Sequence, residues 1–328
     1  MNKEIQVLNK KAEIYSNKIK KVHSEINKVI VGQDRIIEKL LIALISDGHV
    51  LIEGVPGLAK TLMIKTLSEC LNSDFVRLQF TPDLLPADII GTKIYDHKNL
   101  TFKTMKGPIF VNFVLADEIN RAPPKVQSAL LEAMQEKQVT IQGDTIKIKR
   151  PFMVLATQNP IESEGTYKLP EAQVDRFMFK ILINYPSKED EIEIMKRFTE
   201  GLSFKISKLL STKDILEIQE FNKKIYVDDK IKEYVSEIID ATRNPDKYKL
   251  NLGEFIEFGA SPRASLWFIL ASKAHAMING RGYVKPEDIQ AIAYEVLRHR
   301  ILLTYEAEAE EKTSDEIIKI ILDKIKVP

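Results

Sequence analysis

Apolar residues near the start of the chain recur every three or four positions. The spacing holds from residue 5 to residue 19, and an amphipathic run follows from residue 33 to residue 45, before Asp47-Gly48. Such spacing puts the apolar side chains on one face of a helix. We therefore expect helices in residues 1 to about 48.

From residue 49 onward, short apolar runs alternate with segments of helical spacing. The expected order is strand 49–53, helix 60–72, strand 75–79, strand 109–116, helix 123–137, strand 152–156 and strand 179–184. Run 109–116 is almost wholly apolar, which is typical of a strand buried on both faces. Strands that alternate with helices predict an α/β fold, with a mainly parallel sheet and helices on both of its faces.

Two polar insertions interrupt this alternation. Residues 88–106 contain Gly91 and predict a projecting hairpin or a short helix with strands. Residues 139–141 and 146–148 flank a turn-forming centre at 142–145 and predict a β-hairpin. Periodicity does not say what a loop touches. Both insertions are therefore equally compatible with ordinary surface structure and with a role in contacting a client or lining a pore.

After residue 186 strand-like runs nearly vanish and helical spacing continues to the end. Helix starts are indicated at Ser261-Pro262 and at Pro286-Glu287-Asp288, where proline and acidic residues suit a first turn. A chain of 328 residues exceeds the size at which one core usually splits. We expect a smaller all-helical domain over residues 186–328.

Composition adds the class of protein and its expected compartment. Hydrophobic residues make up 44% and charged residues 29%, as in soluble globular proteins. The net charge of +1 gives no global basic field that would argue for nucleic acid. The single cysteine, Cys70, is expected to pack on a helix. No apolar stretch is long enough to span a membrane and no secretory signal is visible, so we expect a cytoplasmic protein.

Candidate chemistry begins where the first strand meets its helix, at Gly54-Val-Pro-Gly-Leu-Ala-Lys-Thr61. Free N–H groups at a helix N-terminus, together with the helix dipole, suit a triphosphate. Gly54 and Gly57 allow a tight turn and close backbone approach, and Pro56 stiffens the loop. The pattern is that of a phosphate-binding loop.

Two side chains of this loop carry specific roles. Lys60 would reach the β- and γ-phosphates, and the Thr61 hydroxyl would bind Mg²⁺. The generic loop has glycine where this chain has Ala59. That position begins the helix, where we expect a helical φ that accommodates a methyl group. The alternative is an ordinary strand–turn–helix junction that happens to contain Lys-Thr.

A second apolar strand ends in Asp117 and Glu118. Ligands bind at the carboxyl ends of strands in open α/β sheets. Asp117 would hold Mg²⁺, directly or through water, and Glu118 would orient or deprotonate an attacking water. The alternative is a solvated acidic turn. Together with the loop, these carboxylates indicate a nucleotide triphosphate site that can hydrolyse as well as bind.

Three further polar residues could complete the site. Asn159 follows a buried strand and could bind the γ-phosphate and position water, although Asn-Pro is also a turn signal. Arg176 precedes the next strand and, by itself, suggests a surface charge. Arg263 stands at a helix start, where cations are disfavoured. A phosphate partner would explain it, and a solvated arginine is the alternative.

These features together resemble the AAA+ ATPases, and specifically the MoxR family, over about residues 28–305. Ala59, which departs from the generic loop, matches the family's own version. The matching motifs are Val31-Gly32-Gln33, Gly54-Val-Pro-Gly-Leu-Ala-Lys-Thr61, Ala116-Asp-Glu-Ile-Asn-Arg-Ala-Pro-Pro124, Ala156-Thr-Gln-Asn-Pro160, Leu169-Pro-Glu-Ala-Gln-Val-Asp-Arg-Phe177, Gly259-Ala-Ser-Pro-Arg-Ala264 and Leu297-Arg-His-Arg-Ile-Leu-Leu303.

The resemblance implies roles for individual residues. ATP would bind at the Walker A residues Gly54, Pro56, Gly57, Leu58, Ala59, Lys60, Thr61 and Leu62. Mg²⁺ would bind at Thr61 and at Asp117 of Walker B. The residues implied in catalysis are Lys60, Glu118 of Walker B, Asn159 as sensor 1, Arg176 as an arginine finger on the neighbouring subunit's nucleotide, and Arg263 as sensor 2.

The resemblance also implies an organisation and partners. Residues 1–27 form an N-terminal helix without an assigned role, 28–185 the P-loop AAA+ core, and 186–328 an all-α lid. The insertions match the family's helix-2 insert, about 88–106, and pre-sensor hairpin, about 139–148. Members usually form hexameric rings and remodel client proteins, often with von Willebrand A-domain partners, in complex maturation or metal-cofactor insertion.

Three other functions stay open at this point. A nucleic-acid motor would share the insertions, but the chain has no added OB-like or zinc domain and no basic stripe beyond its Lys-rich first helix. A metal-chelatase motor subunit would share the core. A nucleotide-gated scaffold with negligible turnover is disfavoured by the intact set of catalytic residues.

Overall fold

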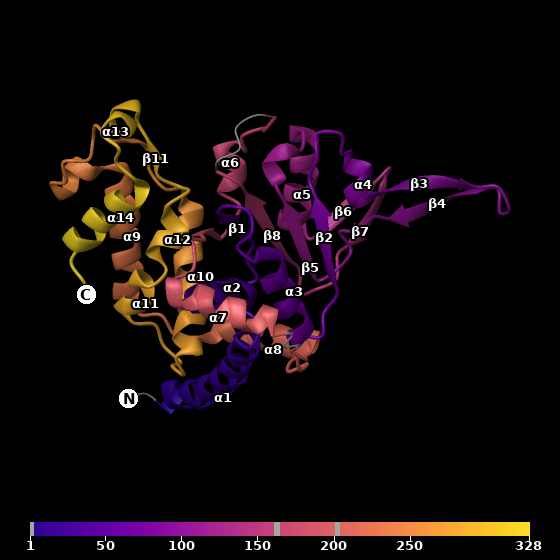
Figure 1. Ribbon diagram of the computed structural model, residues 1–328. Helices are drawn as coiled ribbons and strands as arrows, with labels where there is room; N and C mark the ends of the chain where they lie inside the picture. Colours follow the sequence, from indigo (N-terminus) through magenta and orange to yellow (C-terminus); the bar gives the residue numbers. More distant parts are fainter. Residues whose placement is uncertain (1–2, 161–164, 201–203) are drawn as a thin grey trace.

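A computed structural model describes residues 3–160, 165–200 and 204–328. The first two residues of the expected N-terminal helix, Met1 and Asn2, therefore lie outside the described residues. Figure 1 shows a sheet-based core in the middle, a helical domain on one side and a hairpin that projects on the other.

Five parallel strands form the central sheet. They are β1 (Val50–Glu53), β2 (Phe75–Gln79), β5 (Phe113–Asp117), β8 (Met153–Gln158) and β9 (Phe179–Leu182). Their spatial order is β2-β5-β8-β1-β9, so β8 separates the strand of the candidate loop from the strand of the two carboxylates. Because all strands are parallel, their carboxyl ends meet at one edge of the sheet. The expected parallel sheet is confirmed.

Alternate strand residues pack against different helices. Val114 and Val154 face a core cluster that includes α5 (Pro124–Glu136). Leu115 and Leu155 face the other cluster, which includes α2 (Asp34–Ile45), α3 (Lys60–Cys70) and the helical domain. Helices thus cover both faces, as the alternation of strands and helices predicted.

The strand expected at residues 109–116 begins later, at Phe113. Ile109 is buried, but its N–H donates to the carbonyl of Ile89 rather than to a strand. Gly107 likewise donates to Ile90. The first apolar residues of the run therefore hold the end of the insertion against its start. Their apolar character alone did not distinguish that role from a strand.

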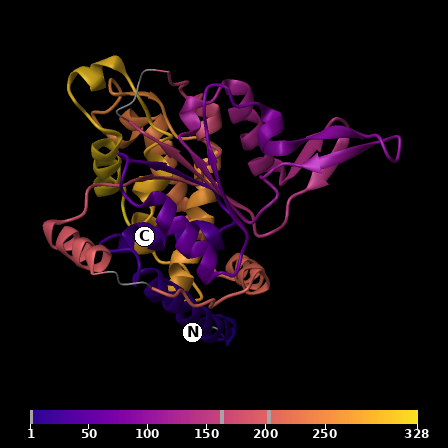
Figure 2. The ribbon, with the colours of Figure 1, turned by 45° about the vertical axis from the view of Figure 1, so that its right-hand side comes forward.

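Both insertions are hairpins. The first consists of α4 (Pro86–Ile90), β3 (Gly91–Asp96) and β4 (Thr101–Lys106), and its strands project from the body in Figures 1 and 2. The second pairs β6 (Gln138–Ile141) with β7 (Asp144–Lys147) around Gln142 and Gly143. Both of these turn residues have positive φ, as a two-residue hairpin turn requires. The turn is thus shorter than the four residues expected.

The rest of the core and the helical domain are built mainly from helices. They are η1 (Ile119–Arg121), α6 (Glu171–Val174), α7 (Lys188–Thr199), α8 (Thr212–Lys224), α9 (Asp229–Arg243), η2 (Pro245–Tyr248), β10 (Ile256–Phe258), α10 (Pro262–Ile278), α11 (Pro286–Gln290), α12 (Ala293–Leu297), β11 (Leu302–Leu303), α13 (Tyr305–Ala309) and α14 (Ser314–Lys324). The helix starts expected at Pro262 and Pro286 are confirmed. Strands β10 and β11 form a small antiparallel pair among these helices.

Helix α1 (Lys3–Ile26) packs against both parts of the molecule. The buried Ser16 hydroxyl donates to the carbonyl of Ile278 at the end of α10, 2.5 Å away. Val22 and Ile26 are buried in the cluster that also contains α3 and the helical domain. This helix therefore joins the sheet core to the helical domain, a role that its sequence alone did not indicate.

Candidate active site

The candidate loop joins β1 to α3 and needs glycine at two positions. A Cβ atom on Gly54 would lie 2.8 Å from the carbonyl oxygen of Ile183, at the end of the neighbouring strand. Gly57 has φ +86°, in the left-handed region that favours glycine. The loop therefore turns tightly while its backbone stays open to a ligand.

The loop holds Ala59, the residue that departs from the generic pattern, in a conformation that we did not expect. Its φ is +54° and its ψ is 22°, so the residue is left-handed rather than helical. The chain leaves the loop through this residue, and the helix begins only at Lys60. The expectation of a helical φ was wrong, because the generic glycine at this position serves the turn before the helix.

Most of the expected site residues meet in one cavity of about 400 Å³ at the carboxyl edge of the sheet, whereas Gly54, Arg176 and Arg263 do not line it. Its lining consists of Pro56, Gly57, Leu58, Ala59, Lys60, Thr61, Leu62, Arg77, Asp117, Glu118, Thr157, Gln158 and Asn159. The first N–H groups of α3 have no carbonyl four residues earlier within the helix. A phosphate group in this cavity would thus meet backbone donors, an ammonium group and two carboxylates.

The Lys60 ammonium lies along the loop, with its Nζ atom 2.5 Å from the carbonyl oxygen of Gly54. Burial lowers the pKa of Lys60, while the charges of Asp117 and Glu118 oppose that shift. Burial disfavours an unpaired cation, and a phosphate in the cavity would supply Lys60 with an anionic partner.

Thr157 on β8 connects the two carboxylate residues. Its hydroxyl donates to Asp117 Oδ1, 2.6 Å away, and accepts from the backbone N–H of Glu118, 2.9 Å away. Glu118 itself has φ +57°. Non-glycine residues in this region cost free energy and cluster at functional sites. The threonine thus fixes the direction in which both carboxylates leave the strand.

Sequence reasoning missed the polar side chains of β2. Arg77 donates to Asp117 Oδ2 at 2.9 and 2.6 Å, and Gln79 donates to Glu118 Oε2 at 2.8 Å. The two residues are two positions apart on one strand, so they share a face of the sheet. Polar residues at alternate positions of this strand could have indicated the pair from the sequence. Only the sheet order, however, places β2 beside β5.

The donor set of the cavity fits Mg²⁺. This ion keeps several waters and binds one or two carboxylates together with substrate phosphates. Thr61 and Asp117 line the same cavity and offer a hydroxyl and a carboxylate. In the described part of the chain no group of three or more His, Cys, Asp or Glu residues could form an all-protein metal site. Arg77 would compete with the ion for Asp117.

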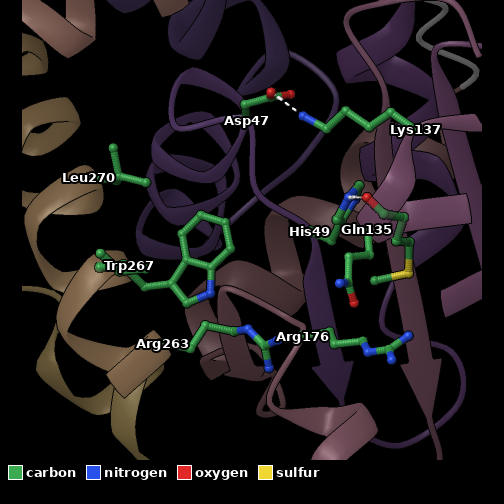
Figure 3. A pocket seen from close by; sticks show the side chains of 10 residues that line it. Asp47, His49, Gln135, Lys137, Arg176, Arg263, Trp267 and Leu270 are labelled. Carbon is green, nitrogen blue, oxygen red and sulfur yellow. Dashed lines mark hydrogen bonds and ion pairs between the residues drawn. The ribbon is translucent and has the colours of Figure 1, made fainter. Parts of the chain in front are cut away.

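Arg176 and Arg263 lie at a different place. They line a cavity of about 270 Å³ between the core and the helical domain, together with His49, Gln135 and Trp267. Figure 3 shows both arginines on one side of this cavity, Arg263 from α10 and Arg176 from the segment after α6. Neither arginine lines the phosphate cavity of its own chain.

The partners of these two arginines differ. Arg263 Nη1 donates to Asp175 Oδ2 at 2.6 Å, so a carboxylate rather than a phosphate accompanies this helix start. The half-buried Arg176 side chain has no hydrogen bond or ion pair to any residue within the described ranges. Arg176 is therefore a cation available to a ligand from outside the chain.

No helix within the described ranges is both long and apolar enough to cross a membrane.

Family models match two segments of the chain. One, described as "ATPase family associated with various cellular activities (AAA)", matches residues 49–179, and one for the AAA lid domain matches residues 251–321.

Individual proteins resemble nearly the whole chain. Chaperone MoxR1 of Mycobacterium tuberculosis is 49% identical over 306 residues, which cover 93% of this chain and 81% of that protein. The uncharacterized protein YeaC of Bacillus subtilis is 43% identical over 309 residues, 94% of each chain. A crystal structure of a protein from Cytophaga hutchinsonii superposes with a TM-score of 0.92 at 50% identity and covers all of both chains.

These similarities agree with the geometry of the chain. The parallel sheet carries the phosphate loop and the paired carboxylates at one edge, and a helical lid domain follows it. The chain belongs to the MoxR family of AAA+ ATPases.

Proposed function

We propose that this protein is a Mg²⁺-dependent ATPase that hydrolyses ATP in a ring of identical subunits and uses the energy to remodel client proteins. The observation that carries the proposal is the convergence of Lys60, Thr61, Asp117, Glu118 and Asn159 on one cavity. Bound Mg²⁺ would neutralise phosphate charge and orient the β- and γ-phosphates.

The residues of the cavity divide the work of hydrolysis. Glu118 accepts a proton from the attacking water, whose oxygen forms the new bond to the γ-phosphorus. The bond from that phosphorus to the bridging oxygen breaks, which gives ADP and phosphate. Lys60 and the first N–H groups of α3 stabilise the phosphate oxygens, and Asn159 positions the water.

We place the nucleoside beside the phosphates. A second cavity of about 650 Å³ is lined by Gly32 and Gln33 of the first family motif. Gln33 Nε2 donates to the carbonyl of Leu58 at 3.4 Å, which joins this cavity to the loop. Gln33 lines the second cavity and Leu58 lines the phosphate cavity, so this long contact lies where the two cavities meet. We assign the base of ATP to this second cavity.

The two arginines act between subunits in this proposal. Because Arg176 and Arg263 line a cavity separate from their own phosphate loop, they would reach the nucleotide of a neighbouring subunit. A finger of this kind contributes only in an assembled ring. We take the ring to be hexameric and the core and lid to meet near residue 185, between β9 and α7.

Client remodelling rests on the projecting hairpin and on the chaperone among the relatives. Leu100 and Phe102 at the tip of the hairpin are 74% and 71% exposed. Apolar side chains exposed on a projection favour contact with protein. We propose a protein client, a von Willebrand A-domain partner and a cytoplasmic location, in maturation or metal-cofactor insertion of complexes.

The first test measures ATP hydrolysis per subunit against protein concentration, with light scattering on the same samples, with Mg²⁺ and with EDTA. We expect turnover to rise as the ring assembles and to vanish in EDTA. Constant turnover from a monomer would contradict catalysis between subunits. Nucleotide binding without turnover at any concentration would contradict the assignment as an ATPase.

Arg176→Ala tests the finger itself. Arginine fingers contribute roughly 10³–10⁵ in rate in GTPases. We expect the variant to bind a fluorescent ATP analogue normally. In samples that light scattering shows to be assembled, we expect it to lose at least about 10³-fold in turnover by the same comparison. Turnover near that of the wild type would remove the role from Arg176.

A further inference from the structure

Asp175 lies where the core meets the lid and next to both arginines. Its carboxylate accepts from Arg300 Nε at 2.7 Å, from Arg263 Nη1 at 2.6 Å and from the Ser261 hydroxyl at 2.9 Å. All three donors belong to the lid. Arg176 follows Asp175 directly in the chain.

Arg300 holds the backbone on both sides of Arg176. Its guanidinium donates to the carbonyls of Asp175 and Phe177, 2.8 and 2.6 Å away, and the side chain is only 1% exposed. His299 Nε2 also donates to the carbonyl of Phe177, at 3.1 Å. The main chain around Arg176 is therefore fixed by buried lid residues, whereas its side chain is left without a partner among the residues described.

We propose that Asp175 is a positioning residue that fixes Arg176 and Arg263 as one unit for the neighbouring subunit's nucleotide. This inference rests on the proposed function. The carboxylate lies between the guanidinium groups of Arg263 and Arg300, which would otherwise repel each other. It thereby ties the sensor arginine on the lid to the backbone position that directly precedes Arg176. Preorganised cations of this kind need no rearrangement when charge develops on the transferred phosphate.

The inference also connects lid position to hydrolysis. A lid movement that pulled Arg300 or Ser261 away would release Asp175 and displace both arginines at once. Errors of about 1 Å in a catalytic group can cost on the order of 10² in rate. Asp175 thereby makes hydrolysis in one subunit depend on the lid of the next.

Asp175→Asn keeps the size of the side chain and removes its charge. We expect kcat of the assembled ring to fall on the order of 10², with KM and ATP affinity unchanged because the variant's own cavity is intact. Asp288→Asn is the matched control. Asp288 is a buried lid carboxylate that accepts from Arg281 at 2.6 and 2.7 Å but does not contact either catalytic arginine.

Mixed rings separate positioning from a loss of stability. Glu118→Gln impairs its own cavity but presents normal arginines to its neighbour. Asp175→Asn has a normal cavity and misplaced arginines. Where an Asp175→Asn cavity faces the arginines of Glu118→Gln, both halves of the site are intact. We expect the mixture to exceed the summed turnover of the two variants measured alone. Arg176→Ala mixed with Glu118→Gln should do the same.

Each outcome decides a different claim. Recovery in both mixtures supports the role of Asp175. Recovery only with Arg176→Ala overturns the positioning role and leaves the proposed function intact. Recovery in neither mixture overturns catalysis between subunits and the inference with it. An equal loss of kcat in Asp288→Asn would mean that general destabilisation explains the effect and would also overturn the inference.

A second variant guards against misfolding of Asp175→Asn. Ser261→Ala removes one hydroxyl donor from Asp175 and keeps every charge. It also removes the cap of α10, which lowers the stability of that helix. We expect a smaller fall in kcat that the same mixing restores. A fall that mixing with Glu118→Gln does not restore would contradict the inference.

Discussion

Ala59 has a backbone conformation that non-glycine residues rarely adopt. A left-handed residue with a Cβ atom costs roughly 1–2 kcal/mol, and glycine pays about 0.5–1 kcal/mol in entropy instead. Ala59→Gly should therefore raise the free energy of unfolding by about 0.5–1 kcal/mol. Urea denaturation measures this free energy of unfolding. Ala87→Gly, at an exposed helical position, should lower stability, and a loss in both variants would contradict the strain at Ala59.

His49 gives a prediction about pH. Its ring accepts from the N–H of Val154 at 3.0 Å and donates to the carbonyl of Met134 at 3.1 Å, so the neutral form is fully bonded. Burial is the main reason that the pKa of His49 is lowered to about 4. The unfolded chain, with a pKa of about 6.5, therefore takes up this proton first as pH falls.

The stability contributed by neutral His49 is complete above about pH 6.5 and is lost as pH falls toward 4. At about 1.4 kcal/mol per pH unit, the contribution of His49 to the free energy of unfolding should be about 2 kcal/mol smaller at pH 5 than at pH 7. Urea denaturation at both values tests this. His49→Gln should be less stable at pH 7 but show a weaker dependence on pH. An unchanged dependence would exclude His49 as its source.

At the scale of elements, α1 explains why one glycine of the lid is needed. A Cβ atom on Gly282 would lie 2.5 Å from the Cβ of Leu8. Gly282→Ala should therefore push α1 away and cost about 1–3 kcal/mol, as overpacking does. Hydrogen exchange should become faster in α1 than elsewhere. Gly253→Ala, whose nearest contact would be an ordinary 3.4 Å, should change neither quantity, and equal effects in both would refute the close contact.

The sequence allowed prediction of elements better than of their neighbours. Alternating runs located all five core strands, because a strand buried in a parallel sheet must be apolar. They did not predict that Ile109 anchors an insertion, since a buried loop residue and a strand residue look alike. The Walker residues followed from local motifs. Arg77, Thr157 and Asp175 did not, because their partners come from other strands or from the lid.

At the scale of the whole molecule, the phosphate cavity and the two arginines lie at separate places, and in the proposed ring each would complete a neighbour's site. The cavity with Lys60 and Glu118 lies at one edge of the sheet, and Arg176 and Arg263 lie beside the lid. Bound ATP would therefore hold neighbouring subunits together, because its γ-phosphate binds groups from both. In the proposed ring, hydrolysis would remove that connection.

Glu118→Gln tests this coupling between nucleotide and assembly. The amide cannot accept the proton of the attacking water, so hydrolysis should nearly stop while binding continues. Because ATP then persists at the interface, the ring should be more stable with Mg-ATP than in the wild type. Light scattering during dilution measures this, and Mg-ADP, which lacks the γ-phosphate, is the control. Rings that dissociate equally with either nucleotide would show that the γ-phosphate does not join the subunits, and retained hydrolysis would show that Glu118 is not the base.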